Sequence, residues 1–108
     1  MKKAKSKNEF RTHNSNKNKN HPTFIFAKVG KKYKFVGITH AEITDGMKNI
    51  PLIKNPNPKD KKPSYFRPFF DDDYISSFGK KKKGWKLCPE DRLKIPKNKK
   101  KKNWTPET

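Results

Sequence analysis

The sequence predicts a mainly β protein (β+α): a small, strongly curved antiparallel barrel or sheet with one or two short C-terminal helices and disordered basic ends. Residues 23–29 and 32–38 are two apolar and aromatic runs joined by Gly30-Lys31, which indicates a β-hairpin. Only 29% of the residues are hydrophobic, so the core is small, yet 12% are aromatic and most of these lie in the middle of the chain. The two ends are rich in Lys and poor in large apolar residues.

These features divide the chain into three parts. Residues 1–20 are predicted to be a disordered basic arm, because Met1 and Phe10 are its only large apolar side chains. Residues 21–96 are predicted to form a single small barrel-like domain, and residues 97–108 a basic C-terminal tail.

The hairpin sets the expected pairing of the central strands. Gly at the first position of a two-residue loop is typical of a type II′ turn, which places Val29 opposite Lys32. Carried along the strands, this register places Ile25 opposite Val36 and Phe26 opposite Phe35. It predicts an aromatic face (Phe24, Phe26, Tyr33, Phe35) and an aliphatic face (Ile25, Val29, Val36, Ile38).

Further strands are expected after the hairpin. Asp45-Gly46 predicts a second tight turn, after which residues 47–53 return as a short strand. Pro51 places that strand at an edge of the sheet, because proline lacks an amide hydrogen. Residues 55–63 are a polar, proline-rich loop, and residues 64–70 form another strand in which Pro68 predicts an edge or a bulge.

Two short helices are expected near the C-terminus. Residues 71–78 begin with three aspartates, which favour the positive end of a helix, and Gly79 would end it. The alternative interpretation of these aspartates is a metal site, but the other acidic residues show no ligand spacing, so no metal or cofactor is expected. A second helix would begin at Pro89, present Leu93 and Ile95 on its apolar side and stop at Pro96.

The net charge of +19 indicates a polyanionic partner, with nucleic acid as the first candidate. An anionic membrane is the second, but neither a basic amphipathic helix nor a lipidation motif is visible. Nearly all of the basic residues are Lys rather than Arg, which favours contacts to the phosphate backbone over reading of bases.

The single cysteine, Cys88, rules out an internal disulfide, and a reducing compartment is expected. No apolar run approaches membrane-spanning length, and the N-terminal residues lack the apolar segment of a signal peptide. The expected localisation is cytoplasmic.

Lysine clusters and one tryptophan are the expected nucleic-acid contacts. The run of residues 80–83 followed by Trp85 combines cations for phosphates with a ring for base stacking. The alternative for Trp85 is a place in the core beside Leu87. The predicted nucleic-acid-binding residues are Lys31, Lys32, Lys34, Lys61, Lys62, Lys80, Lys81, Lys82, Lys83 and Trp85.

His21 and His40 are the strongest catalytic candidates. Metal-independent RNA cleavage needs a base for the 2′-OH, an acid for the leaving oxygen and a cation near the phosphate. Histidine suits the first two roles because it titrates near neutral pH. The hairpin register places His21 opposite His40 with Thr39 alongside. The alternative is that both histidines are ordinary polar residues at the ends of strands.

The hairpin also resembles the MazF/PemK-like endoribonuclease toxins. The resemblance covers residues 21–53 and rests on His21-Pro22 before the first strand and on Ile38-Thr39-His40 at the end of the second. It implies an SH3-like barrel, endoribonuclease activity and an acidic antitoxin-like protein partner. His21 stands where the family has a catalytic Arg, and Thr39 matches the active-site Thr. The preceding strand of the family, with its Gly-Asp signal, is missing.

The functional hypothesis is therefore RNA binding with metal-independent endoribonuclease activity of the toxin type. His21 and His40 would share the acid–base work, and Thr39 and Arg67 would hold the phosphate. The main alternative is a nucleic-acid-binding accessory protein without catalysis. A protein that masks an acidic protein partner is a third possibility.

Overall fold

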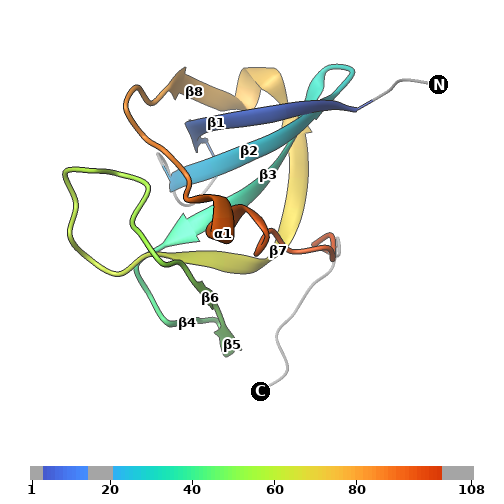
Figure 1. Cartoon of the computed structure of the whole chain (residues 1–108). Coiled ribbons are helices and arrows are strands. Elements are labelled where there is room, and N and C mark those ends of the chain that lie inside the picture. Colours follow the sequence, from blue (N-terminus) through green and yellow to red (C-terminus); the bar gives the residue numbers. More distant parts are fainter. Residues whose placement is uncertain (1–3, 15–20, 101–108) are drawn as a thin grey trace.

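Antiparallel strands are the main secondary structure of the protein (Figure 1). The computed structural model describes residues 4–14 and 21–100, and the elements below belong to that part of the chain. The strands are β1 (Lys5–His13), β2 (His21–Val29), β3 (Lys32–Thr39), β4 (Ile43–Thr44), β5 (Met47–Lys48), β6 (Ile50–Pro51), β7 (Tyr65–Tyr74) and β8 (Phe78–Lys81). A 3₁₀ turn, η1 (Ile75–Ser77), precedes β8, and a short helix, α1 (Pro89–Arg92), follows it.

The main sheet is open. Its six strands lie in the order β6-β7-β3-β2-β1-β8, and β4 and β5 form a separate small hairpin. β6 and β8 stand at opposite edges and do not pair with each other, so the sheet is neither closed nor strongly curled. The mainly β antiparallel class is confirmed, whereas the closed, strongly curved barrel is not what the structure shows.

The N-terminal segment belongs to the sheet. β1 lies between β2 and β8, and Phe10 on this strand is only 2% exposed. The Phe10 ring packs against Phe24 and Trp85, with ring centroids 5.0 and 5.6 Å apart. Burying one phenylalanine side chain stabilises a fold by about 1.5–3 kcal/mol, which offsets the poor strand propensity of the Lys- and Asn-rich segment. The prediction of a disordered arm is therefore wrong for Lys5–His13; residues 1–3 and 15–20 lie outside the described residues.

The central hairpin has the expected register near its turn and a different register beyond a bulge. Gly30 has a φ of 61°, as a type II′ turn requires, and Val29 opposes Lys32. A bulge between Ile25 and Ala27 then shifts the register, so that Ile25 opposes Phe35 and Phe24 opposes Val36. The predicted pairs Ile25–Val36 and Phe26–Phe35 are wrong, because one bulged residue moves all later side chains by one position.

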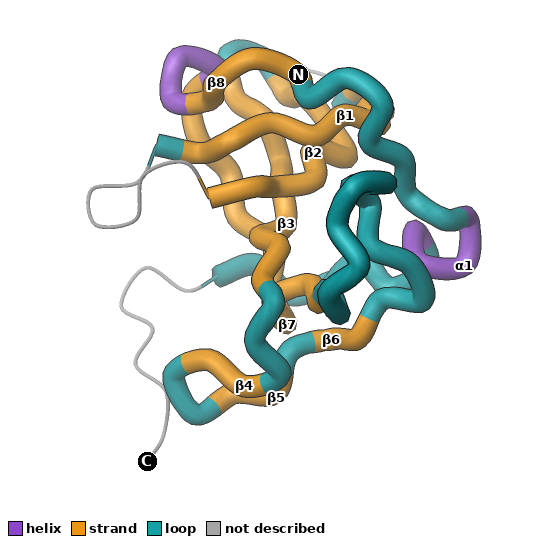
Figure 2. Tube along the Cα trace, turned by 90° about the vertical axis from the view of Figure 1, so that its left-hand side faces the viewer, coloured by secondary structure: helices purple, strands orange, loops and turns teal. Residues whose placement is uncertain are grey.

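The shift gives each face of the sheet a mixture of aromatic and aliphatic residues. One face carries the larger core, made of Phe10, Phe24, Val36, Ile38 and Phe66. The other carries a smaller cluster of Ile25, Tyr33 and Phe35, against which Ile75 and Phe78 pack. Figure 2 shows the long strands as one layer, with α1 and the longer loops on one side of it.

β7 is longer than the sequence predicts. It continues through the three aspartates, which pair in register with Phe35, Lys34 and Tyr33 of β3 instead of starting a helix. Asp72 is also close to two lysines, Lys32 at 4.0 Å and Lys99 at 2.9 Å. The prediction of a helix over residues 71–78 is wrong, because pairing with a basic strand outweighs the local preference of aspartate for helix starts. Residues 75–77 retain only a single 3₁₀ turn.

Local turn and boundary signals are confirmed. Asp45 and Gly46 both have positive φ, 51° and 76°, and connect β4 to β5. Pro51 lies on the edge strand β6. Pro68 lies where the β3–β7 register shifts, which is the predicted bulge.

α1 begins at Pro89 as predicted and ends at Arg92. Ile95 packs against the larger core, but Leu93 is 86% exposed, so the expected apolar side is wrong for Leu93. Neither α1 nor η1, the helices of the described ranges, has the length and apolar character needed to cross a bilayer.

Candidate functional site

A cavity of about 280 Å³ opens where β2 begins and β3 ends. It lies on the face of the smaller cluster and is lined from β1, β2, β3, β7 and the β4–β5 turn. We call it the histidine cavity; its lining residues are His13, His21, Thr23, Phe35, Gly37, Ile38, Thr39, Thr44, Asp45, Arg67, Phe69, Asp71 and Lys100.

The two histidines of this cavity come from neighbouring strands. His13, the last residue of β1, opposes His21, the first residue of β2. Directly opposed residues of antiparallel strands project from the same face, with Cβ atoms about 5 Å apart. The predicted pair of His21 with His40 is wrong, because the bulge shifts β3 and the β-sheet partner of His21 is His13.

His13 is held firmly at the edge of the smaller cluster. Its Nε2 donates a hydrogen bond to Asp73 Oδ2 at 2.8 Å. Its ring packs against Phe35 and Phe78, with centroids 4.6 and 4.8 Å apart. The bond to Asp73 fixes the orientation of the ring and leaves Nδ1 as its second nitrogen. His21 is exposed, and no hydrogen bond ties its ring to another described residue.

Asp73 is the residue that anchors His13. Partial burial would raise the pKa of this carboxyl, but the hydrogen bond from His13 and the backbone N–H of Tyr74 outweigh that effect. The pKa of Asp73 is therefore lowered from its ordinary value, and the anion is the favoured form.

Arg67 reaches the cavity from the bulge of β7. Its Nη1 donates to Asn49 Oδ1 at 2.6 Å, and its guanidinium lies 4.9 Å from the centre of the Phe69 ring. Gly37 leaves room for it, since a Cβ at that position would lie 3.0 Å from Arg67 Cγ. Burial lowers the pKa of Arg67 from its ordinary value, and the nearby Asp45 carboxylate counteracts part of this.

Asn49 holds this arrangement in place. The side chain is 5% exposed, and its Nδ2 donates to Ala41 O and Thr44 Oγ1, both at 2.9 Å. It thereby connects Arg67 to the β4–β5 hairpin, which forms one wall of the cavity.

The fixed charges of the histidine cavity balance. Arg67 and Lys100 contribute two cations, and Asp45 and Asp71 contribute two carboxylates. Lys100 lies there because its backbone N donates to Phe70 O at 2.7 Å, which aligns the start of the C-terminal segment with β7. The two cations therefore lie beside two carboxylates, and the cavity carries no excess of fixed charge.

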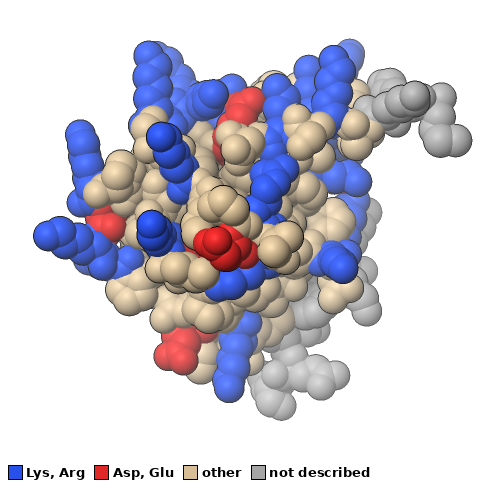
Figure 3. Space-filling view, viewed as in Figure 1, with Lys and Arg blue, Asp and Glu red and all other residues tan. Residues whose placement is uncertain are grey.

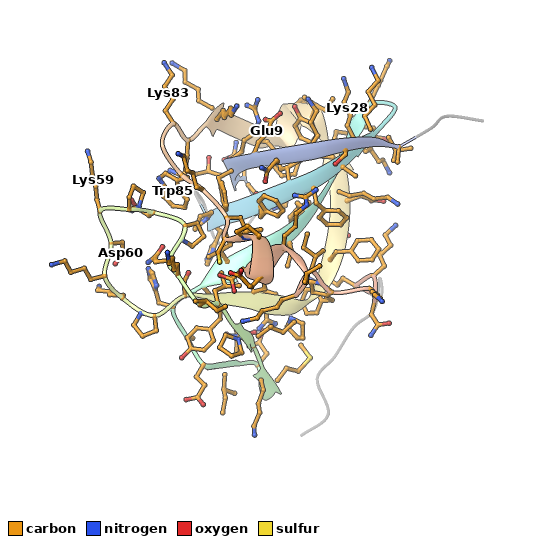
Figure 4. All side chains as sticks on the ribbon, viewed as in Figure 1. Glu9, Lys28, Lys59, Asp60, Lys83 and Trp85 are labelled. Carbon is orange, nitrogen blue, oxygen red and sulfur yellow. The ribbon has the colours of Figure 1, made fainter. Side chains whose placement is uncertain are left out.

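A second cavity of about 430 Å³ adjoins the first. We call it the tryptophan cavity; it is lined by His21, Pro22, Ile38, Thr39, His40, Ala41, Asn55, Asp60, Ser64 and Trp85. His21, Ile38 and Thr39 line both cavities. In Figure 4, Asp60 extends from the long loop before β7, and Trp85 lies in the segment between β8 and α1.

His40 lies in the tryptophan cavity, and both of its ring nitrogens are engaged. Nδ1 donates to Pro63 O at 2.9 Å, and Nε2 lies 3.0 Å from Asp60 Oδ2. This pairing ties the end of β3 to the long loop. A ring held in this way is a poorer proton shuttle than His13 or His21.

The four predicted catalytic residues thus lie around two adjoining cavities. His21, Thr39 and Arg67 line the histidine cavity, whereas His40 lines only the tryptophan cavity. Thr39 Oγ1 accepts a hydrogen bond from Ala41 N at 3.1 Å, which keeps its hydroxyl proton available.

The predicted nucleic-acid-binding residues fall into two groups. Lys61, Lys62, Lys82 and Lys83 belong to the two segments that border the tryptophan cavity, and Lys80 and Lys81 end the preceding strand β8. Lys31, Lys32 and Lys34 lie at the turn end of the central hairpin, just before Phe35, which lines the inner end of the histidine cavity. Figure 3 shows Lys and Arg side chains projecting from most of the outline of one face, with Asp and Glu in a few separate patches.

Trp85 occupies the core position that one of the two interpretations of the sequence predicts. Its ring packs against the larger core, as the core interpretation predicts, and also lines the tryptophan cavity. Lys82 Nζ lies 5.1 Å from the centre of the ring.

Sequence reasoning missed His13, Asp73 and Lys100. His13 was assigned to a disordered arm, and the available signal was a second histidine just before an Asn-rich linker, with Phe10 as an apolar anchor upstream. Lys100 carries no local signal, because only the pairing of its segment with β7 brings it to the cavity. No group of three or more His, Cys, Asp or Glu side chains suited to a metal ion occurs among the residues the structure describes.

Comparisons with known proteins do not assign the chain to a family. No protein-family model matches the chain, and no match is found among the curated proteins or the solved structures.

Proposed function

We propose that the protein binds single-stranded RNA and cleaves it without a metal ion, with His13 and His21 sharing the acid–base work. The observation that carries the proposal is the cross-strand pairing of these histidines in a cavity that also holds Arg67 and Lys100. Two imidazoles beside two cations are the side chains that attack by the 2′-OH requires. His13 replaces His40 in this role, because both ring nitrogens of His40 are engaged.

The reaction is an internal transfer at phosphorus. One imidazole takes the proton of the 2′-OH, whose oxygen attacks the adjacent phosphorus atom. The bond from phosphorus to the 5′-oxygen breaks, and that oxygen takes a proton from the other imidazole as it leaves. The products are a 2′,3′-cyclic phosphate and a new 5′-OH. Asp73 keeps the His13 ring in one orientation through its hydrogen bond to Nε2.

Arg67, Lys100 and Thr39 are assigned to the phosphate. The two cations stabilise the negative charge that grows on the non-bridging oxygens during attack. The Thr39 hydroxyl donates to one of these oxygens. Asn49 acts only by positioning Arg67.

The remaining support comes from charge and from the resemblance. The net charge of +19 favours a polyanion, and the nucleophile of the reaction exists in RNA but not in DNA. The resemblance to MazF/PemK-like toxins adds the expectation of a cytoplasmic toxin with an acidic antitoxin-like partner. The resemblance implies that His21 takes the place of the family's catalytic Arg and that Thr39 is the active-site Thr, and the proposal keeps both residues in the site.

Incubation with end-labelled RNA in EDTA tests the proposal. We expect cleavage that ends in a cyclic phosphate and no cleavage of the same strand with 2′-deoxyriboses. His13→Ala and His21→Ala should each slow cleavage by roughly 10²–10⁴-fold, with little change in RNA affinity. The double variant should lose far less than the product of the two single losses, because the residues act as one unit. At saturating RNA, His40→Ala should slow cleavage far less than His13→Ala or His21→Ala, because His40 does not line the histidine cavity.

A second candidate function is RNA binding without catalysis. The observation that favours it is the packing of His13 between Phe35 and Phe78, which also suits a structural histidine. If no RNA is cleaved and the His21→Ala variant binds RNA like the parent, the binding function becomes the better conclusion.

A further inference from the structure

The tryptophan cavity has the form of a binding site for a planar ring. Much of its wall is apolar, with Trp85, Pro22, Ile38 and Ala41 contributing. Its volume of about 430 Å³ accommodates a nucleobase.

One lining residue has an unused hydrogen-bonding group. Ser64 is 3% exposed, and its Oγ is the one buried side-chain polar atom without a partner among the described residues. A buried hydroxyl normally pairs with protein, water or ligand, since an unpaired one costs stability. A serine hydroxyl both donates and accepts, so it can pair with any of the polar edges of a base.

The rim of the cavity is organised in advance. Asn55 Nδ2 donates to Lys62 O, and its Oδ1 accepts from Asn57 N, both at 3.0 Å. On the other side, Asp60 holds His40 and accepts from Lys62 N at 3.0 Å. These hydrogen bonds hold the long loop in place before a ligand binds, so binding does not have to pay the entropic cost of ordering the loop.

Trp85 is also held in place. Its ring lies against Phe10, and Lys82 lies 5.1 Å from the ring centre. Bases stack readily on such a ring, and lysines on both flanking segments can contact the phosphates of the same strand. Lys59 and Lys83 point outward on either side of Trp85 in Figure 4. An apolar small molecule has no group that pairs with these lysines, whereas the phosphate of a nucleotide does. The charges therefore favour a nucleotide as the ligand.

We propose that the tryptophan cavity binds one unpaired nucleobase of an RNA strand, stacked on Trp85 and hydrogen-bonded to Ser64. His21, Ile38 and Thr39 form a wall common to both cavities, so the phosphate next to this base lies in the histidine cavity. The location of that phosphate rests on the proposed function. The base site is argued separately, from the lining of the tryptophan cavity and the unpaired hydroxyl of Ser64.

Nucleoside 5′-monophosphates and the fluorescence of Trp85 provide the test. In a Trp104→Phe background Trp85 is the only tryptophan. We expect at least one of AMP, CMP, GMP and UMP to quench its emission in a saturable manner. Ser64→Ala should weaken that binding at least fivefold without lowering the melting temperature, since it removes an unpaired hydroxyl. Ser76→Ala, an exposed serine outside both cavities, is the matched control and should bind like the parent.

A second variant tests the location of the site. Ala41 is exposed at the rim, and Ala41→Phe should fill the cavity and abolish quenching. Absence of quenching by all four nucleotides, or unchanged binding in both Ser64→Ala and Ala41→Phe, would overturn the base site. Quenching without any RNA cleavage would overturn the proposed catalysis alone, and cleavage without quenching would overturn the base site alone.

Discussion

Asp73 connects the histidine cavity to the stability of the fold. Its pKa is lowered in the folded protein, because the bonds from His13 and Tyr74 N outweigh burial. A carboxyl with a lower pKa in the folded state adds stability that is complete above its unfolded pKa. That stability is lost as the pH falls through the folded value.

Asp73→Asn should therefore make the melting temperature less sensitive to acid. The expected result is a lower melting temperature than the parent at pH 6, with the difference shrinking below about pH 4, where the parent loses this contribution. Thermal unfolding from pH 2 to pH 7 measures it, with Glu42→Gln at an exposed position outside both cavities as the control. A constant difference at every pH would contradict the assignment.

The residues of the candidate site were predictable to different degrees. His21, Thr39 and Arg67 were named from the sequence and do line one cavity, because each lies in or beside a strand with a clear local pattern. His13 could not be found in that way. Its position depends on a pairing between β1 and β2 that is held by Phe10, and the sequence around Phe10 reads as a solvated basic segment.

α1 is an element that cannot be stable alone. It has four residues, far below the length at which isolated helices persist. The buried carboxylate of Asp91 holds it in place by accepting from Ile53 N at 2.8 and 3.0 Å and from Lys54 N at 3.3 Å. Lys94 Nζ lies 3.2 Å from the same carboxylate.

Asp91→Asn should lower the free energy of unfolding by about 2–3 kcal/mol, since an amide leaves a buried charge-assisted network incomplete. Urea unfolding measures the loss. Glu90→Gln, at the exposed neighbouring position, should change stability little. Equal effects of the two substitutions would show that Asp91 does not anchor α1 to residues 53 and 54.

Elements set by local signals were predicted, and those set by distant pairing were not. Gly30, Asp45-Gly46 and Pro89 act within a few residues and define the turns and the helix start as expected. The run Asp71-Asp72-Asp73 satisfies a local helix rule, yet it lies beside Lys34 on β3 and near Lys32 and Lys99. Such a partner is visible only once the sheet is assembled.

For the whole molecule, charge should dominate the affinity for RNA. With about six phosphate contacts to a single strand, log K against log salt should have a slope of roughly −4. Fluorescence anisotropy with a labelled oligonucleotide at 50–400 mM salt measures it. A flat dependence would remove nucleic acid as the principal partner.

The position of the charges should matter as well as their number. Lys61→Gln with Lys83→Gln, on the segments beside the tryptophan cavity, should weaken binding and reduce the slope. Lys5→Gln with Lys31→Gln changes the charge equally at the other end of the sheet and should have a smaller effect. Equal losses from both pairs would indicate binding spread over the whole surface.

The open sheet has two free edges, and their composition bears on how the protein behaves at high concentration. A free edge exposes backbone groups that can pair with the edge of another molecule. β6 offers only two residues, one of them Pro51, and β8 presents exposed Lys80 and Lys81. The lysines that we assign to RNA phosphates thus also repel a second copy of the chain at this edge. Bound RNA neutralises that repulsion, so an RNA-saturated protein loses part of its protection against aggregation.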